Sequence, residues 1–158
     1  MVTLIGMGSG SWEALSVQAQ DAVRRAGLVF GAKRLLAGLP PECTARQFAL
    51  YQPAEILETL AQAPGQDAAV LYSGDTGFYS GASGLLTPLR ALGIPARVYP
   101  GVSSIQLLAA ALGRPWQDWK LVSAHGCACD PVAECMTERS VFFLTGGAET
   151  PATLCRKL

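Results

Sequence analysis

The chain repeats one local pattern three times. Residues 2–5, 68–72 and 96–99 are short apolar runs, and each stops at a loop of glycine or serine that leads into a helical pattern. Apolar runs of this length, bounded by turn residues, are typical of strands that a parallel sheet buries on both faces. Strands that alternate with helices are joined by right-handed crossovers. The sequence therefore predicts the α/β fold class, with an open, mainly parallel sheet in which residues 68–72 form a central strand.

Capping residues mark the helix boundaries. Ser16 is suited to cap the N-terminus of the first helix, and Gly27 stands where a left-handed C-terminal cap belongs. The other expected elements are helices from residue 53 to near 64, over 81–92 and over 105–112, and strands at 28–30 and 46–50.

The pattern breaks at residues 113–118, where glycine, proline and polar residues interrupt it. We therefore expect an N-terminal α/β domain over residues 1–115 and a second α/β domain over residues 116–158. Roughly 40 residues bury too little surface for an independent core, so the second domain is expected to be incomplete and the chain to be a fragment. The expected elements there are strands at 120–124 and 140–144, and helices at 131–138 and from residue 150 onward.

Composition disfavours several classes of function. Lysine plus arginine number 12, as do aspartate plus glutamate, so the formal net charge is zero and no nucleic-acid partner is expected. The longest wholly apolar stretch, residues 107–112, is far shorter than the roughly 18 residues of a membrane span, and no basic leader precedes the first strand. Neither a membrane protein nor a secreted precursor is expected. Five cysteines in a chain with an ample apolar core favour a reducing, cytoplasmic location.

The three loops predict a ligand site at one edge of the sheet. In open α/β sheets, ligands bind beyond the carboxyl ends of the strands, where glycines let backbone N–H groups approach them. The first loop does not fit the dinucleotide fingerprint, because Ser11 stands where the third glycine would be and Gly31 follows the next strand in place of an acid. A Walker motif is also missing from the sequence. A nicotinamide, flavin or phosphoryl-transfer site is therefore disfavoured.

The order of the loop motifs resembles the tetrapyrrole methylase family. The motifs are residues 4–11 (LIGMGSGS), 73–79 (SGDTGFY) and 99–104 (YPGVSS). Within that family, the second motif and the strand ends at 123–126 (SAHG) and 143–147 (FLTGG) are most similar to the CbiE-type branch, the precorrin-6Y C5,15-methyltransferases of cobalamin biosynthesis. The resemblance implies the tetrapyrrole methylase fold with two α/β domains. It also implies transfer of a methyl group from S-adenosylmethionine to C5 of precorrin-7 or cobalt-precorrin-7.

The same resemblance implies partners and a cofactor site. The partners are a corrinoid tetrapyrrole substrate and a second copy of the chain in a homodimer. Whether a separate partner enzyme performs methylation and decarboxylation at C15 stays open. Thr76 departs from the family pattern, since many members outside this branch carry proline after the aspartate. The implied cofactor-binding residues are Gly6, Gly8, Ser9, Ser73, Gly74, Asp75, Phe78, Ser103, Ser104 and Leu144.

The chemistry requires few reactive side chains. Methyl transfer from a sulfonium is an in-line displacement that needs alignment and exclusion of water. We identify no catalytic base, and we expect no metal site because the cysteines at 127, 129 and 135 lack the usual ligand spacing. Asp75 fits an Asx turn as well as a ligand contact, and a lone histidine is more often structural. The candidates for substrate contact are Tyr79, Lys33, Arg34 and His125.

Two alternative functions stay open. A methylase of the same fold could act on another acceptor, such as uroporphyrinogen or a protein side chain. A noncatalytic fragment would bind S-adenosylhomocysteine weakly or not at all, and a chain with an incomplete second domain is expected to lack robust activity. The sequence does not distinguish a cobalt-containing substrate from a cobalt-free one.

Overall fold

A computed structural model describes residues 1–127 and 129–158. Its contacts divide the chain into a first unit, Met1–Ser103, and a second unit, Ser104–Leu158. We expected the boundary near residue 115, which is later in the chain than the observed boundary after Ser103. The residues between these two positions form the helix α5 (Ser104–Leu112) and the turn that follows it. The assignment of α5 to the N-terminal domain stays a prediction.

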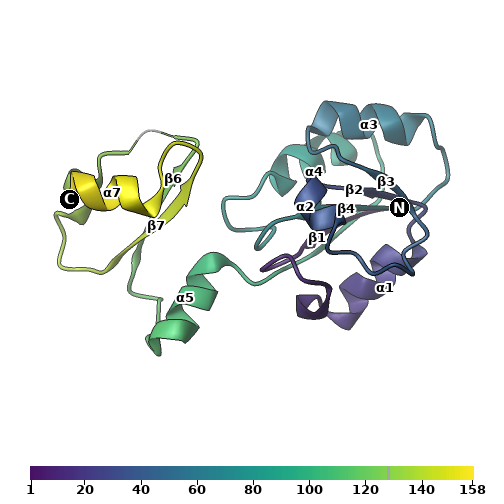
Figure 1. Ribbon diagram of the computed structural model, residues 1–158. Helices are drawn as coiled ribbons and strands as arrows, with labels where there is room; N and C mark the ends of the chain where they lie inside the picture. The colour runs from purple at the N-terminus through teal and green to yellow at the C-terminus, as the bar shows by residue number, and fades with distance from the viewer. Residues whose placement is uncertain (128) are drawn as a thin grey trace. The chain divides into compact units, whose positions relative to one another are not determined.

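The first unit contains a parallel sheet of five strands, which confirms the predicted fold class. The strands lie in the order β3-β2-β4-β1-β5, so β4 is the central one, as expected. Gly6 of β1 pairs with Tyr72 of β4, and Ile5 of β1 pairs with Tyr99 of β5. The carboxyl ends of these three neighbouring strands therefore meet at one edge (Figure 1). The strands are β1 (Val2–Gly6), β2 (Leu28–Phe30), β3 (Arg46–Phe48), β4 (Ala68–Tyr72) and β5 (Ala96–Tyr99).

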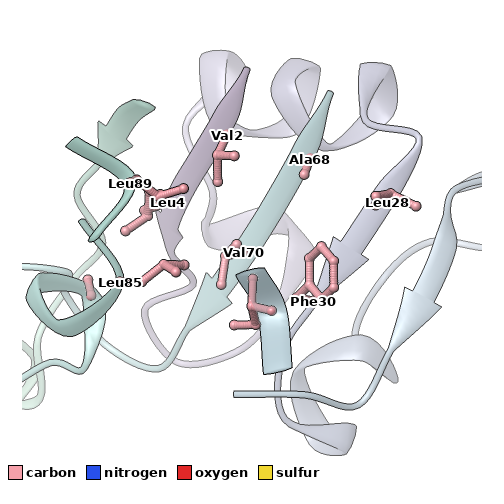
Figure 2. Close-up of a cluster of buried hydrophobic side chains, with 10 residues drawn as sticks. Val2, Leu4, Leu28, Phe30, Ala68, Val70, Leu85 and Leu89 are labelled. Carbon is pink, nitrogen blue, oxygen red and sulfur yellow. The ribbon is translucent and has the colours of Figure 1, made fainter. Parts of the chain in front are cut away.

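Helices cover both faces of this sheet, because side chains along each strand alternate between them. Val2 and Leu4 of β1 belong to a cluster that includes residues of α3 and α4, shown in Figure 2. Ile5 and Met7 belong to a second cluster, with residues of α1 and α2. Figure 1 shows α3 and α1 on opposite sides of the sheet. The helices of this unit are η1 (Trp12–Ala14), α1 (Val17–Arg25), α2 (Lys33–Leu36), α3 (Pro53–Ala61) and α4 (Ala82–Ala91).

The two predicted caps of α1 had different outcomes. The Ser16 hydroxyl accepts a hydrogen bond from the backbone N–H of Ala19 at 3.2 Å, which confirms the N-cap. The predicted C-cap at Gly27 was wrong, because Ala26 caps the helix with an extended backbone. Gly27 instead donates its N–H to the carbonyl of Asp67 at 2.8 Å. The residue already takes part in the approach of β2 to β4, so the helix ends without a left-handed turn.

The second unit contains two parallel strands, β6 (Lys120–His125) and β7 (Val141–Gly146), close to the predicted positions. The helix α6 (Pro131–Cys135) is shorter than the expected 131–138, because Met136 leaves the helical conformation with ψ 65°. Thr150 is the N-cap of the helix α7 (Pro151–Lys157), and its hydroxyl accepts a hydrogen bond from the Thr153 N–H in a capping box. None of the described helices combines the length and the apolar composition that a membrane span requires.

Candidate functional site

Three loops follow the carboxyl ends of β1, β4 and β5. We call residues 6–10 the first loop, residues 73–79 the second loop and residues 100–103 the third loop. Gly8 and Gly74 exchange two backbone hydrogen bonds of 3.0 Å, one in each direction. Just before them, the N–H of Met7 donates to the carbonyl of Tyr72 at 2.8 Å. The first and second loops are therefore joined through their backbones.

Asp75 joins the second loop to the third. One carboxylate oxygen, Oδ1, accepts the N–H of Gly101 at 3.1 Å, and the other, Oδ2, accepts the N–H of Gly77 at 3.0 Å. The second bond is the Asx turn that the sequence allowed. Nearby, the Thr76 hydroxyl donates to the carbonyl of Tyr99 at 3.4 Å. The Asp75 side chain thus acts as a bracket between loops, and its predicted contact with a cofactor stays a prediction.

Close backbone packing explains the glycine at position 6. A Cβ atom added to Gly6 would lie 2.6 Å from the backbone nitrogen of Gly101 and 2.7 Å from the carbonyl oxygen of Gly74. Real Cβ atoms do not approach backbone that closely, so only glycine fits where the three loops meet. Gly6 is buried, and its position supports a role in holding the loops together.

Gly74 has the opposite surroundings. Its φ is +66°, which favours glycine, and no heavy atom lies within 4 Å of the place where a Cβ would stand. The neighbouring side chain of Ser73 is exposed, as is that of Ser9 in the first loop. A ligand can therefore approach the backbone of the second loop closely at Gly74.

Two aromatic side chains end the second loop. The rings of Phe78 and Tyr79 pack edge to face, with centroids 4.9 Å apart and an interplanar angle of 73°. Phe78 is half-buried, whereas Tyr79 is 53% exposed. An apolar surface therefore adjoins the polar groups of the loop.

The two basic candidates lie on α2, a helix that the sequence pattern did not predict. A Cβ added to Gly10 would lie 3.9 Å from Nη1 of Arg34, so the Arg34 guanidinium reaches the first loop. Lys33 is exposed at the start of the same helix. The geometry supports Arg34 as a candidate more than Lys33.

The remaining candidates lie at or beyond the end of the first unit. Ser103 is its buried last residue, and Ser104 begins α5. In the second unit His125 pairs with Gly146 across the strands, and the imidazole fills the space that a side chain at Gly146 would need. Leu144 pairs with Ser123 two residues earlier on the same two strands. Each of these assignments stays a prediction.

Cysteine side chains are common metal ligands. Within residues 1–127 and 129–158, no group of three or more His, Cys, Asp or Glu side chains is placed to hold a metal ion. Burial raises the pKa of the Cys129 thiol, and the charge of Glu149 raises it further.

Two cavities in the first unit lie away from the three loops. One, of about 370 Å³, is apolar and lies at the amino ends of the strands, between Val2, Leu60 and Ile94. The other, of about 300 Å³, is lined by Thr3, Arg97 and other residues on the α1 side of the sheet. No residue of the three loops lines either one.

Two glycines that were not among the predicted site residues also take part in joining the loops. Gly77 and Gly101 donate the backbone N–H groups that hold the Asp75 carboxylate. Both were present in the recognised motifs, and the glycine two residues after an aspartate is the usual signal of an Asx turn. For Gly101 the signal was weaker, because its partner is distant in the sequence.

Comparisons with known proteins agree with this geometry. The family profile of the tetrapyrrole (corrin/porphyrin) methylases matches residues 1–158. The chain is 31% identical to the cobalt-precorrin-7 C(5)-methyltransferase of Salmonella typhimurium over 160 residues, which cover all of this chain and 77% of that protein. These matches confirm the resemblance that the loop motifs indicated.

The fold is also similar to that of solved structures. The precorrin-6Y methylase (CbiE) of Archaeoglobus fulgidus superposes with a TM-score of 0.66 at 20% identity, over 91% of this chain and 72% of that one. The methyltransferase CobJ gives a TM-score of 0.69 at 24% identity, over 84% of this chain and 59% of that one. At these identities the two structures show the shared fold, while the full-length family match carries the assignment. The chain belongs to the tetrapyrrole (corrin/porphyrin) methylase family.

Proposed function

We propose that this chain is an S-adenosylmethionine-dependent C-methyltransferase that methylates C5 of precorrin-7 or cobalt-precorrin-7 in cobalamin biosynthesis. The supporting observation is the joining of the three family loops at the carboxyl edge of β1, β4 and β5, through the Gly8–Gly74 backbone pair and the Asp75 carboxylate. The match to a cobalt-precorrin-7 C(5)-methyltransferase covers all of this chain at 31% identity, and it supports this substrate.

The residues present fit the cofactor. The open space beside Gly74 admits a ligand up to the loop backbone. The exposed hydroxyl groups of Ser9 and Ser73 match a molecule that carries ribose hydroxyls, a carboxylate and an amine. The half-buried ring of Phe78 offers an apolar surface for a flat base. When bound, S-adenosylmethionine supplies an activated methyl group on a positively charged sulfur.

The chain's own part in the reaction is alignment. With S-adenosylmethionine held there, the loops would place its methyl group in line with an electron-rich ring carbon of the corrinoid. The carbon–carbon bond would form as the methyl–sulfur bond breaks, the sulfur would leave as a neutral thioether, and the positive charge would pass to the macrocycle until the ring carbon loses its proton. No proton is needed by this leaving group, which is consistent with a site built from glycines, hydroxyls and one bracketed carboxylate. Because a misplacement of about 1 Å can lower such a rate on the order of a hundredfold, the bracket at Asp75 is expected to matter through geometry.

Assembly and location are part of the same proposal. The helix α5 exposes three apolar side chains, Leu107, Leu108 and Leu112, between 42% and 53%. Such a surface supports burial against another protein surface, and we propose a homodimer. The five cysteines are free, which supports a cytoplasmic location. We further propose that methylation and decarboxylation at C15 belong to a partner enzyme.

The function is tested by following a labelled methyl group. The chain is incubated with precorrin-7 or cobalt-precorrin-7 and S-adenosylmethionine that carries a ¹³C-methyl group, and the product is examined by NMR. We expect calorimetric binding of S-adenosylhomocysteine and one labelled methyl group at C5, formed slowly, in keeping with the expectation that this chain lacks robust activity. Label at another ring carbon would assign a different acceptor position within the family. Binding of a nicotinamide cofactor in place of both adenosyl compounds would overturn the proposal.

A further inference from the structure

Tyr79 has an unusual backbone conformation for a large side chain. Its φ is +47°. Among the described residues of the chain, all others with a positive φ are glycines. This left-handed region is rare outside glycine, asparagine and aspartate, because Cβ approaches the backbone carbonyl. An aromatic residue adopts it at a cost in free energy, and such residues cluster at binding and catalytic sites.

The rest of the second loop imposes this conformation. Asp75 accepts the N–H of Gly77 at 3.0 Å, and its own carbonyl accepts the N–H of Phe78 at 3.4 Å. On the other side, the hydroxyl of Ser80 accepts the N–H of Ala82 at 3.2 Å, at the start of α4. Tyr79 therefore lies between two segments that are each fixed by hydrogen bonds.

Core packing does not account for the tyrosine. The side chain is 53% exposed, and its described ring contact is the edge-to-face pair with Phe78. A glycine or an asparagine would fill the left-handed position with less strain. The residue thus combines an unfavourable backbone with an exposed aromatic ring, directly after the loop that carries Gly74 and Asp75.

We propose that Tyr79 is a substrate-positioning residue whose ring packs against the corrin macrocycle of the acceptor. This inference rests on the proposed function, and it names one side chain that recognises the acceptor separately from the cofactor. A corrin is a large ring system with a conjugated, largely apolar face, and such a face packs well on an aromatic ring. The edge-to-face contact with Phe78 fixes the orientation of the Tyr79 ring before the substrate arrives.

The test uses variants that separate strain from recognition. Tyr79→Asn keeps a residue that tolerates the left-handed backbone and removes the ring, whereas Tyr79→Phe keeps the ring. The matched control is Tyr51→Asn, because Tyr51 is also exposed, at 67%, and lies outside the three loops. For each full-length variant the melting temperature, the Kd of S-adenosylhomocysteine and the KM of the corrinoid acceptor are measured.

We expect Tyr79→Asn to melt at or above the wild-type temperature and to bind S-adenosylhomocysteine within about twofold of wild type. Its KM for the acceptor should rise at least about tenfold. Tyr79→Phe should restore that KM to within about threefold, and Tyr51→Asn should change none of the three quantities. An unchanged KM in Tyr79→Asn would overturn the inference. A lower melting temperature together with an equal loss of cofactor affinity would also overturn it, because both indicate a purely structural residue.

A direct binding measurement separates this inference from the proposed function. Cobyrinic acid, a stable corrin with free carboxylate groups, is followed by its visible absorbance in equilibrium dialysis against wild type and Tyr79→Asn. If wild type transfers no methyl group but binds this corrin at least about tenfold more tightly than Tyr79→Asn, then the proposed reaction fails and the role of Tyr79 stands. If the two proteins bind it equally, or neither binds it, the role of Tyr79 is rejected.

Discussion

The carboxylate of Asp75 accepts the backbone N–H of Gly101 at 3.1 Å, although 26 residues separate them in the sequence. The bond connects the loop after the central strand β4 with the loop after the edge strand β5, and it passes beside β1, which lies between those strands. The second carboxylate oxygen of Asp75 accepts the N–H of Gly77, which lies in the same loop as Asp75. One side chain therefore sets the distance between two of the three loops.

Replacement of Asp75 by asparagine should separate these loops. The amide keeps one acceptor oxygen but points an NH₂ donor at one of the two backbone N–H groups, so one hydrogen bond is lost and a donor is left facing a donor. We expect a loss of about 1–2 kcal/mol in the free energy of unfolding, and weaker binding of S-adenosylhomocysteine. Chemical denaturation and calorimetry measure the two effects. The control is Asp21→Asn, which removes an exposed ion pair with Arg24 and should cost less than about 0.5 kcal/mol. Equal effects of both substitutions would contradict the role of the Asp75 hydrogen bonds in joining the second and third loops.

Gly74 and Gly93 form a matched pair for testing the ligand site. Each has a φ of +66° and open space where a Cβ would stand, but Gly93 lies after α4, outside the three loops. Substitution by alanine should therefore destabilise both variants by a similar amount, about 1 kcal/mol. Only Gly74→Ala should weaken S-adenosylhomocysteine binding, by at least about tenfold, when both are titrated calorimetrically. Equal affinities in the two variants would show that Gly74 has a structural role alone.

The imidazole of His125 should move when Gly146 gains a side chain. The ring occupies the place where a methyl group on Gly146 would stand, so Gly146→Ala must rotate it away while the β6–β7 pairing persists. The chain contains a single histidine, whose imidazole Hε1 gives one well-resolved signal in proton NMR. We expect that signal to shift in the variant, with little change in the circular dichroism spectrum. An unmoved signal would contradict the packing of the ring on Gly146.

Tyr72 should make stability depend on pH in the alkaline range. Burial raises the pKa of its phenol from 10.0 to about 12. The unfolded chain therefore releases this proton at a lower pH than the folded chain does, and stability falls as the pH rises from about 10 to about 12, while the contribution is fully present below pH 10. Urea unfolding at a series of pH values measures the slope. Tyr72→Phe should reduce it, whereas Tyr51→Phe, at an exposed tyrosine, should retain it.

Much of the first unit could be predicted because its signals are local. The apolar run of β4 is continuous because both faces of a central parallel strand are covered, and the order β3-β2-β4-β1-β5 places it there. The cap at Ser16 depends on a hydroxyl and an N–H only three residues apart, so the spacing alone contains it. The glycine loops were likewise found from residues next to one another in the chain.

Signals that depend on a distant partner were missed or misread. Gly27 has the sequence context of a left-handed helix cap, but its N–H donates a hydrogen bond to the carbonyl of Asp67, and Ala26 is the C-cap of α1. The helix α2 spans a single turn, too short for a periodic pattern, and it lies in the same apolar cluster as α1 and β1 through Leu35. The position of Arg34 beside the first loop therefore depends on tertiary packing, which the local sequence pattern does not show.

The sequence by itself determined the strands, most helices, the three loops and the family, because each depends on residue types within a few positions of one another. Only the tertiary structure decided what the loop residues do. Gly6 is enclosed by the backbones of Gly74 and Gly101, whereas Gly74 faces open space, although both read as loop glycines. The difference arises because the sheet register brings β1, β4 and β5 to a common edge, and packing at that edge depends on distances between segments that are far apart in the chain.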